Sequence, residues 1–201
     1  MKKKLLKKIK HEIKKQYPNY SEEKIDEIMY GVEGIYLTIT KTIIIFLIAF
    51  IFGIYKELLM LLIAFNFIRL FAFGMHASNS IVCLILSSTI FLVSSYLCKY
   101  IVIPENILYV LYIIFFMIIA VYAPADTVKR PLIKRKKRIT FKILSLIIVI
   151  SFFVITLLIK NDLVINSMAF GLLIESLLIL PFTYKVFKMP YKNYKNYGLN
   201  I

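Results

Sequence analysis

Six long apolar segments, separated by short polar connections, dominate the amino-acid sequence. At about 1.5 Å per residue, each segment forms a helix of roughly 24 to 30 Å, close to the thickness of a bilayer's hydrocarbon core. A hydrophobic content of 60% and a mean hydropathy of +0.80 leave too little polar surface for a soluble globule. We therefore expect an all-α, polytopic membrane protein with about six transmembrane helices, at residues 35–54, 58–73, 81–98, 107–123, 143–159 and 163–180.

Lysine and arginine gather in three regions beside these segments. Residues before Gly34 contain nine lysines, residues 129–142 contain eight Lys or Arg, and more lysines follow Pro181. With six spans, all three regions fall on one face, and basic loops stay in the cytoplasm. We expect both termini to be cytoplasmic, with a basic amphipathic N-terminal segment, a six-helix transmembrane domain and a basic tail at residues 1–34, 35–183 and 184–201.

The N-terminal segment combines apolar side chains at helical spacing with lysines. Leu5, Leu6, Ile9 and Ile13 predict an amphipathic helix that lies on anionic membrane lipid. Ser21, followed by two glutamates, predicts the start of a second helix. No cleavable signal peptide is expected, because more charge follows the first basic stretch. The basic runs flank membrane spans, so nucleic acid is not an expected partner.

His76 and Cys83 are the candidate catalytic residues, because ionisable groups are costly at membrane depth and usually have a function there. On one continuous helix they would lie about 10.5 Å apart along the axis, too far for proton transfer. Gly74 and residues 78–80 can break the helix. A helix starting at 79 or 80 then places Cys83 in its first turn, which favours a thiolate, and His76 is the base. The alternatives are an interfacial histidine and an apolar filler cysteine.

The second cysteine, Cys98, is not a disulfide partner for Cys83. The two are separated by about 22 Å if both lie on one helix. Small residues in the apolar segments can let helices approach closely, within one chain or across a homodimer. They include Ser94, Ser95, Ala169 and Gly171. No metal site and no cofactor are expected, since clustered acids and a phosphate-binding Gly-Lys motif are not seen.

Three further polar residues have candidate supporting roles. Arg69 can bind a peptide carboxylate or carbonyl oxygen, or it can pair with Glu175 or a helix end. Asn79 can orient His76 or stabilise an oxyanion, or it can simply cap a helix. Asp126 can orient His76 as a third group, or it can cap the turn that contains Pro124.

A basic stretch follows the fourth apolar segment. Besides holding this loop in the cytoplasm, it can attract an acidic substrate tail, as oppositely charged surfaces do. The candidate substrate-binding residues are Lys129, Arg130, Lys134, Arg135, Lys136, Lys137 and Arg138.

Several of these residues form a pattern that resembles the AgrB (accessory gene regulator protein B) family. The pattern consists of Arg69, Gly74, His76-Ala77 and Cys83, followed by residues 122–127 and the basic run from Lys129. The resemblance covers nearly the whole chain, with one departure at Phe73-Gly74, where many members have Gly-Gly. It implies a membrane cysteine endopeptidase that processes a short AgrD-like precursor into a cyclic autoinducing peptide for quorum sensing, with His76 and Cys83 as the catalytic residues.

Thiol chemistry gives such an enzyme a route to a cyclic product. Cys83 attacks a precursor carbonyl and forms a thioester, and a cysteine of the bound peptide exchanges onto it to close a thiolactone. The main alternative is a membrane peptide transporter or channel without protease activity, because Arg69 and Glu175 can line a path. A second is a non-catalytic scaffold. The precursor's sequence, cleavage position and ring size are not encoded in this chain.

Overall fold

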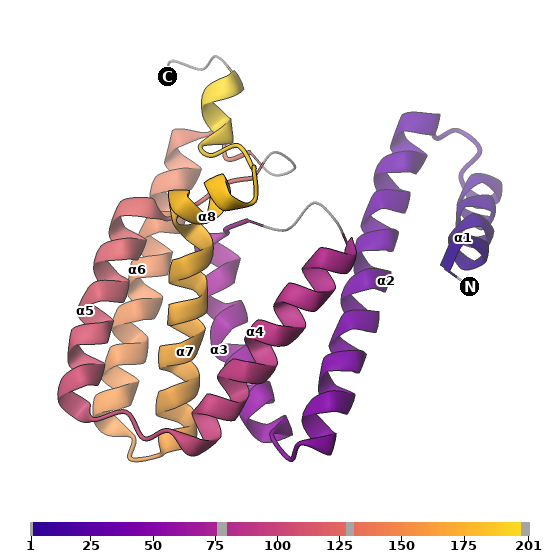
Figure 1. Cartoon of the computed structure of the whole chain (residues 1–201). Helices are drawn as coiled ribbons and strands as arrows, with labels where there is room; N and C mark the ends of the chain where they lie inside the picture. Colours follow the sequence, from indigo (N-terminus) through magenta and orange to yellow (C-terminus); the bar gives the residue numbers. More distant parts are fainter. Residues whose placement is uncertain (1, 76–79, 128–130, 198–201) are drawn as a thin grey trace. The chain divides into compact units, whose positions relative to one another are not determined.

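Eight α-helices and one short 3-10 helix make up the described part of the chain (Figure 1). The computed structural model describes residues 2–75, 80–127 and 131–197. The elements are α1 (Lys2–Gln16), α2 (Glu22–Ile51), α3 (Tyr55–Ala72), α4 (Ser80–Tyr100), α5 (Glu105–Tyr122), α6 (Arg135–Leu158), α7 (Asp162–Ile179), α8 (Pro181–Val186) and η1 (Asn193–Tyr197). The all-α prediction is confirmed.

The chain divides into two units, Met1–Ile48 and Ala49–Ile201. The boundary between them falls inside α2, which is helical from Glu22 to Ile51. Helical structure therefore continues through residue 34, where the N-terminal segment was expected to end. The division of the chain into a basic segment, a peptidase domain and a tail remains a prediction.

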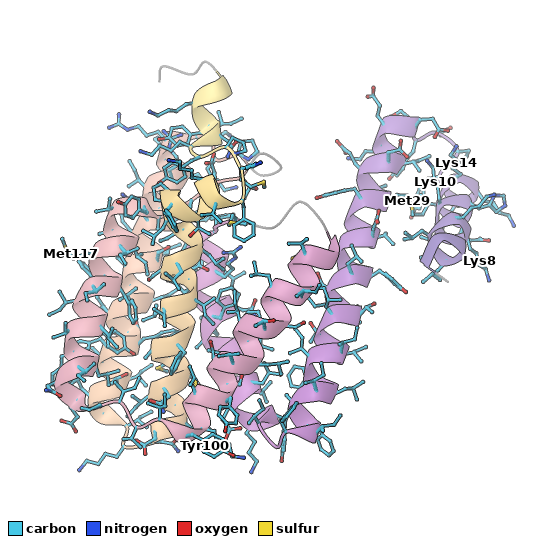
Figure 2. The ribbon with its side chains drawn as sticks, viewed as in Figure 1. Lys8, Lys10, Lys14, Met29, Tyr100 and Met117 are labelled. Atoms are coloured by element: carbon cyan, nitrogen blue, oxygen red, sulfur yellow. The ribbon has the colours of Figure 1, made fainter. Side chains whose placement is uncertain are left out.

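The N-terminal unit is a helical hairpin. Lys10 and Lys14 lie where α1 faces α2, and Lys8 lies on the outer side of α1 (Figure 2). The Lys10 ammonium is 2.6 Å from Asp26, and Lys14 pairs with Glu22. Ser21 begins α2 as predicted, because its hydroxyl accepts a hydrogen bond from the Lys24 N–H at 3.3 Å.

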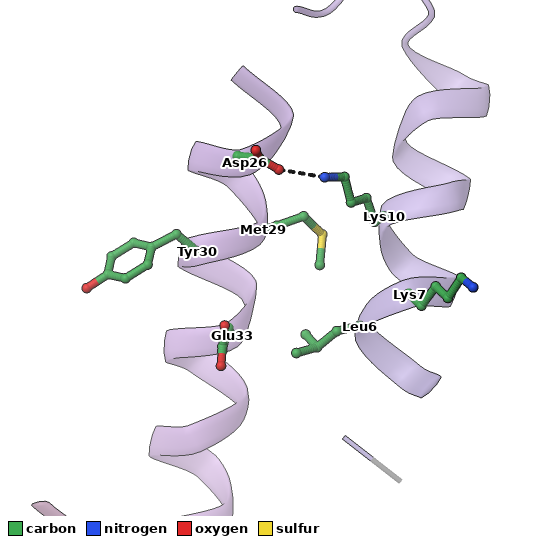
Figure 3. A pocket seen from close by; sticks show the side chains of 7 residues that line it. All are labelled: Leu6, Lys7, Lys10, Asp26, Met29, Tyr30 and Glu33. Atoms are coloured by element: carbon green, nitrogen blue, oxygen red, sulfur yellow. Dashed lines mark hydrogen bonds and ion pairs between the residues drawn. The ribbon is translucent and has the colours of Figure 1, made fainter. Parts of the chain in front are cut away.

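The apolar residues of α1 are half-buried rather than fully exposed. Leu6, Ile9 and Ile13 fall in this class, whereas Leu5 is 45% exposed. Leu6 and Met29 face each other across a shallow pocket between α1 and α2 (Figure 3). The predicted helix is therefore present, and part of its apolar face packs on α2. Its attachment to anionic lipid remains a prediction.

Within the described residues, five helices are long and apolar enough to cross a membrane. They are Glu22–Ile51, Val82–Tyr100, Glu105–Tyr122, Arg135–Leu158 and Asp162–Ile179. Apolar side chains on their outer faces are exposed, as Met117 on α5 shows (Figure 2). A bilayer is the environment in which such faces are stable, so the chain is a multi-pass membrane protein.

The remaining apolar segment forms α3, which has charged residues near both of its ends. It is 18 residues long and carries Lys56, Glu57 and Arg69. Helices α4, α6 and α7 pack around it, and Leu58, Leu61 and Ile68 have no exposed surface. A helix face that packs against other helices can hold a charge that lipid would not accept.

Helix α7 packs closely against α3 at Gly171. A Cβ atom at this position would lie 3.1 Å from the Phe65 backbone nitrogen and 3.2 Å from the Ala64 Cβ. The expected close approach of helices at small residues therefore occurs within one chain at this position. The buried core continues from this contact along α3, α5, α6 and α7.

Candidate active site

Arg69 lies in the last turn of α3 and binds three acceptors at once. Its Nη1 is 3.1 Å from an oxygen of Glu175 on α7. Its Nη2 donates to the carbonyl oxygens of Gly74 at 3.1 Å and Met75 at 2.6 Å. The side chain of Glu175 is completely buried and that of Arg69 is 13% exposed. The pairing with Glu175 that was one alternative for Arg69 is therefore present, together with two backbone contacts.

Gly74 is the residue that allows this arrangement. Its φ is +107°, a conformation that side chains strongly disfavour. A Cβ atom at this position would overlap Arg69 Nη1 and lie 3.2 Å from Arg69 Cζ. Phe73 also has a positive φ, of +63°, and its ring packs 5.2 Å from that of Phe141. Phe73 therefore holds, with some strain, a conformation that glycine adopts freely.

The segment from Ala72 to Met75 is also tied to the loop after α5. The Gly74 N–H donates to the Ala125 carbonyl at 2.8 Å, and the Ala125 N–H donates to the Ala72 carbonyl at 2.9 Å. These bonds form a parallel bridge between Phe73 and Ala125. On the other side, the Met75 N–H donates to the Leu178 carbonyl at 3.4 Å. The chain is thus held by α3, α7 and the 123–127 loop at the point where it leads to His76.

Asp126, which is 2% exposed, anchors the C-terminal tail to this loop. One carboxylate oxygen accepts the N–H of Tyr194 at 2.8 Å, and the other accepts that of Asn193 at 3.0 Å. The Leu132 N–H lies 3.4 Å from the first oxygen. The carboxylate is therefore shielded from open water, and it connects the 123–127 loop to the start of the 131–134 segment and to η1.

Tyr184 of α8 completes the connection. Its hydroxyl donates to the carbonyl oxygens of Ala125 at 3.2 Å and Asp126 at 3.1 Å. Burial raises the pKa of the Tyr184 hydroxyl further above neutrality than its ordinary value. A hydrogen-bonded path therefore runs from the tail through the 123–127 loop to Gly74.

Cys83 is the one of the two predicted catalytic residues that the structure describes. Cys83 is half-buried, and it is the fourth residue of α4, which begins at Ser80 as expected. His76 and Asn79 lie outside the described residues. Cys98 is buried and both cysteines are free thiols, so the prediction that they do not pair is confirmed.

The candidate substrate-binding residues lie at the start of α6. Lys134 is its N-cap, and Arg135, Lys136 and Lys137 are exposed. Arg138 is half-buried, donates to the Leu132 and Ile133 carbonyl oxygens, and lies 4.0 Å from the centre of the Tyr194 ring. Lys129 and Arg130 lie outside the described residues.

Sequence reasoning named Glu175 as a possible partner of Arg69 and as a residue that could line a transport path. It missed Tyr184 and Asn193 as parts of this site. An acid inside an apolar segment was a visible signal for Glu175, since such residues usually have a function. Tyr184 and Asn193 gave no signal, because a tyrosine and an asparagine in a polar tail are ordinary.

Comparison with known proteins gives a consistent result. The accessory gene regulator B family model matches residues 3–179. An AgrB-like protein of Clostridium acetobutylicum is 37% identical over 175 residues, which cover 87% of this chain and 84% of that protein. The accessory gene regulator protein B of Staphylococcus saprophyticus is 31% identical over 162 residues, covering 78% and 85%. No solved structure is significantly similar. The chain therefore belongs to the accessory gene regulator B family, which functions in the agr quorum-sensing system.

Proposed function

We propose that the chain is a membrane cysteine endopeptidase that cleaves a short AgrD-like precursor, with Cys83 as nucleophile and His76 as general base. The placement of Cys83 carries the proposal. Cys83 is half-buried in the first turn of α4, where backbone N–H groups have no partner within the helix. The family's association with autoinducing-peptide processing supplies the substrate class.

The described residues just before His76 are held by several contacts. Residues 72–75 are held by Arg69, Ala125 and Leu178, and His76 is the next residue. Cys83 follows seven residues after His76, so only a short segment of sequence separates the two residues in this proposal. Proton transfer needs heavy atoms within about 3.2 Å, which a fixed starting point for this short segment favours.

The reaction follows from these roles. The imidazole of His76 takes the thiol proton, and the sulfur of Cys83 attacks a precursor carbonyl carbon. The C–N bond breaks as the imidazolium passes its proton to the leaving amine, which departs with the C-terminal fragment. A peptide cysteine then loses its proton to His76 and attacks the thioester. The bond to Cys83 breaks, Cys83 regains a proton, and the peptide leaves as a thiolactone.

Thioester exchange explains why the nucleophile is sulfur. One thioester replaces another at little cost in free energy, whereas a serine ester would make ring closure unfavourable. The site must also exclude water, because water would hydrolyse the thioester before the ring closes. Burial of the neighbouring residues Ala72, Met75 and Ala125 is consistent with such exclusion.

The remaining roles extend the same proposal. The basic residues Lys134, Lys136 and Lys137 attract an acidic end of the precursor from the cytoplasm. The positively charged loops place both termini and the active site on the cytoplasmic side. α1 rests on anionic lipid where the precursor also lies, and the protein acts as a homodimer.

Purified protein in liposomes, incubated with a synthetic precursor, tests the proposal. The wild type cleaves the peptide without an ion gradient or nucleotide. Cys83→Ala abolishes cleavage, and the matched variant Cys98→Ala retains it, because Cys98 is buried on the same helix away from the first turn. Cys83→Ser forms no thiolactone.

Three results would contradict the proposal. A transporter would move the precursor intact across the liposome membrane, and a scaffold would bind it without change. Thiolactone formation by Cys83→Ala at the wild-type rate would also exclude Cys83 as the nucleophile.

A further inference from the structure

An open pocket of about 360 Å³ lies where α5 ends and α6 begins. The last residues of α5, the first turns of α6 and the tail around Lys192 line it. It is separate from the Cys83 thiol, which does not line it. Its position at the ends of two membrane helices places it at the border between hydrocarbon and water.

The charges in this pocket are strongly unbalanced. Among its described lining residues, the cations are Arg135, Arg138, Lys142 and Lys192, and the acid is Asp126. Asp126 already accepts backbone hydrogen bonds from the tail. The pocket therefore has an excess of positive charge, and an anion is the ligand that it suits.

The four cations differ in how fully the protein itself uses them. Arg138 donates to two backbone carbonyls and stacks on Tyr194. Lys142 donates to the Ala120 carbonyl at 2.7 Å, and an ammonium has three donors. Arg135 and Lys192 are exposed at the rim. Arg138 is therefore structural, and the other three can coordinate a ligand.

One wall of the pocket is apolar, a feature that binding of a water-soluble anion does not require. Val121 is 61% exposed and Ile139 is 49% exposed, and both line the pocket. Arg135, Ile139 and Lys142 follow one another at helical spacing on one face of α6. Each of these two apolar residues belongs to a membrane helix, so the wall continues into the lipid-facing surface.

We propose that this pocket binds the headgroup of one anionic phospholipid, with its phosphate between Arg135, Lys142 and Lys192 and the start of an acyl chain along Val121 and Ile139. Basic pockets between membrane helices are suited to such headgroups. The combination of cations with an exposed apolar wall favours a lipid over a soluble acidic peptide, because an acyl chain can continue from the wall along the lipid-facing surface of the helices. This site depends on the membrane location of the chain and not on peptidase activity.

Native mass spectrometry of the full-length protein in detergent, with added phosphatidylglycerol or phosphatidylcholine, tests the site. The wild type retains one phosphatidylglycerol in preference to phosphatidylcholine. The triple variant Arg135→Gln/Lys142→Gln/Lys192→Gln lowers this retention at least about tenfold, because each cation near a lipid surface contributes to binding. The matched variant Lys134→Gln/Lys136→Gln/Lys137→Gln removes the same number of positive charges, at the start of α6 but outside the pocket. This variant retains the lipid.

Two additions distinguish a specific lipid site from general charge attraction and from a peptide site. The single variant Arg135→Glu, a change at an exposed side chain, also weakens phosphatidylglycerol binding. It replaces the triple variant in the test if the triple variant does not fold. Free glycerol phosphate does not displace the lipid, because it lacks an acyl chain. Equal loss in both triple variants would mean general charge attraction and would overturn the proposal. Displacement of the lipid by a soluble acidic peptide would assign the pocket to a peptide and would overturn it as well.

Discussion

The N-terminal hairpin and the end of the helical bundle each contain an ion pair between residues far apart in sequence, but the two pairs differ in environment. The side chains of Lys10 and Asp26 are 36% and 66% exposed, whereas those of Arg69 and Glu175 are 13% and 0% exposed. The hydrogen bond to Asp26 raises the pKa of Lys10 above its ordinary value. Water and salt screen the first pair, and the bundle shields the second.

The comparison shows that similar pairs of charges can serve different purposes. Exposed pairs contribute little to stability, so the Lys10–Asp26 pair mainly selects how α1 lies on α2. A buried pair offers little net gain over apolar side chains, but loss of one partner leaves an uncompensated charge. The buried Arg69–Glu175 pair therefore makes the backbone at Gly74 and Met75 dependent on α7.

Removal of the buried acid should have the largest effect on stability. Glu175→Gln leaves the Arg69 charge without its partner, and we expect a loss of about 3 to 5 kcal/mol in the free energy of unfolding. Thermal unfolding in detergent measures it. Asp26→Asn is the matched control in the exposed pair and should leave the melting temperature unchanged. Equal losses of stability in Glu175→Gln and Asp26→Asn would contradict the difference inferred between the buried and the exposed ion pair.

The two units should respond in opposite directions to the same change at glycine. Gly74→Ala places a methyl group against Arg69 at a φ of +107°, and we expect a loss of about 2 to 3 kcal/mol. Gly31→Ala meets nothing within 4 Å and should stabilise α2 by about 0.5 to 1 kcal/mol. The same unfolding measurement compares them, and a stabilising effect of Gly74→Ala would contradict the structure of the 72–75 segment.

Loss of the Asp126 charge should release the C-terminal tail. Asp126→Asn weakens the bonds from Asn193 and Tyr194, and we expect a local loss of about 1.5 to 3 kcal/mol because these bonds involve a charged acceptor. Trypsin cleavage after Lys192 and Lys195 should become faster. Asp162→Asn, at the exposed start of α7, serves as the control and should leave these cleavage rates unchanged.

Removal of the helix cap in the N-terminal unit should have the smallest of the destabilising effects. Ser21→Ala deletes the acceptor of the Lys24 N–H, and caps contribute about 1 kcal/mol. Hydrogen exchange should rise at residues 22–25, while the end of the bundle around Asp126 keeps its wild-type protection. Spread of faster exchange into that region would show that the two units are coupled.

Much of the fold could be predicted from the sequence, because membrane helices produce patterns among residues that are close together in the chain. The apolar runs, the Ser21 cap and the start of α4 at Ser80 depend on residues close together in the chain. The candidate site could be predicted less completely. Arg69 was recognised as an ionisable group in an apolar segment, but the choice among its partners depended on where α7 packs.

Asp126 illustrates the limit most clearly. Its neighbours Pro124 and Thr127 suggested a local turn, whereas its carboxylate binds backbone N–H groups 67 and 68 residues away. Local sequence contains no information about which distant backbone group will be left without a partner. The basic pocket is similar, because Lys192 joins Arg135 and Lys142 only when the tail folds back.

The amino-acid sequence by itself determined that this chain is a helical membrane protein, that it resembles the accessory gene regulator B family, and that Cys83 is its candidate nucleophile. These properties depend on hydrophobicity, helical periodicity and residue identity, which are local. Tertiary structure alone decided that Arg69 pairs with Glu175, that Gly74 must lack a side chain, and that Asp126 binds the tail. Each of these depends on long-range packing, because a buried polar group is satisfied by whichever partner the fold brings to it.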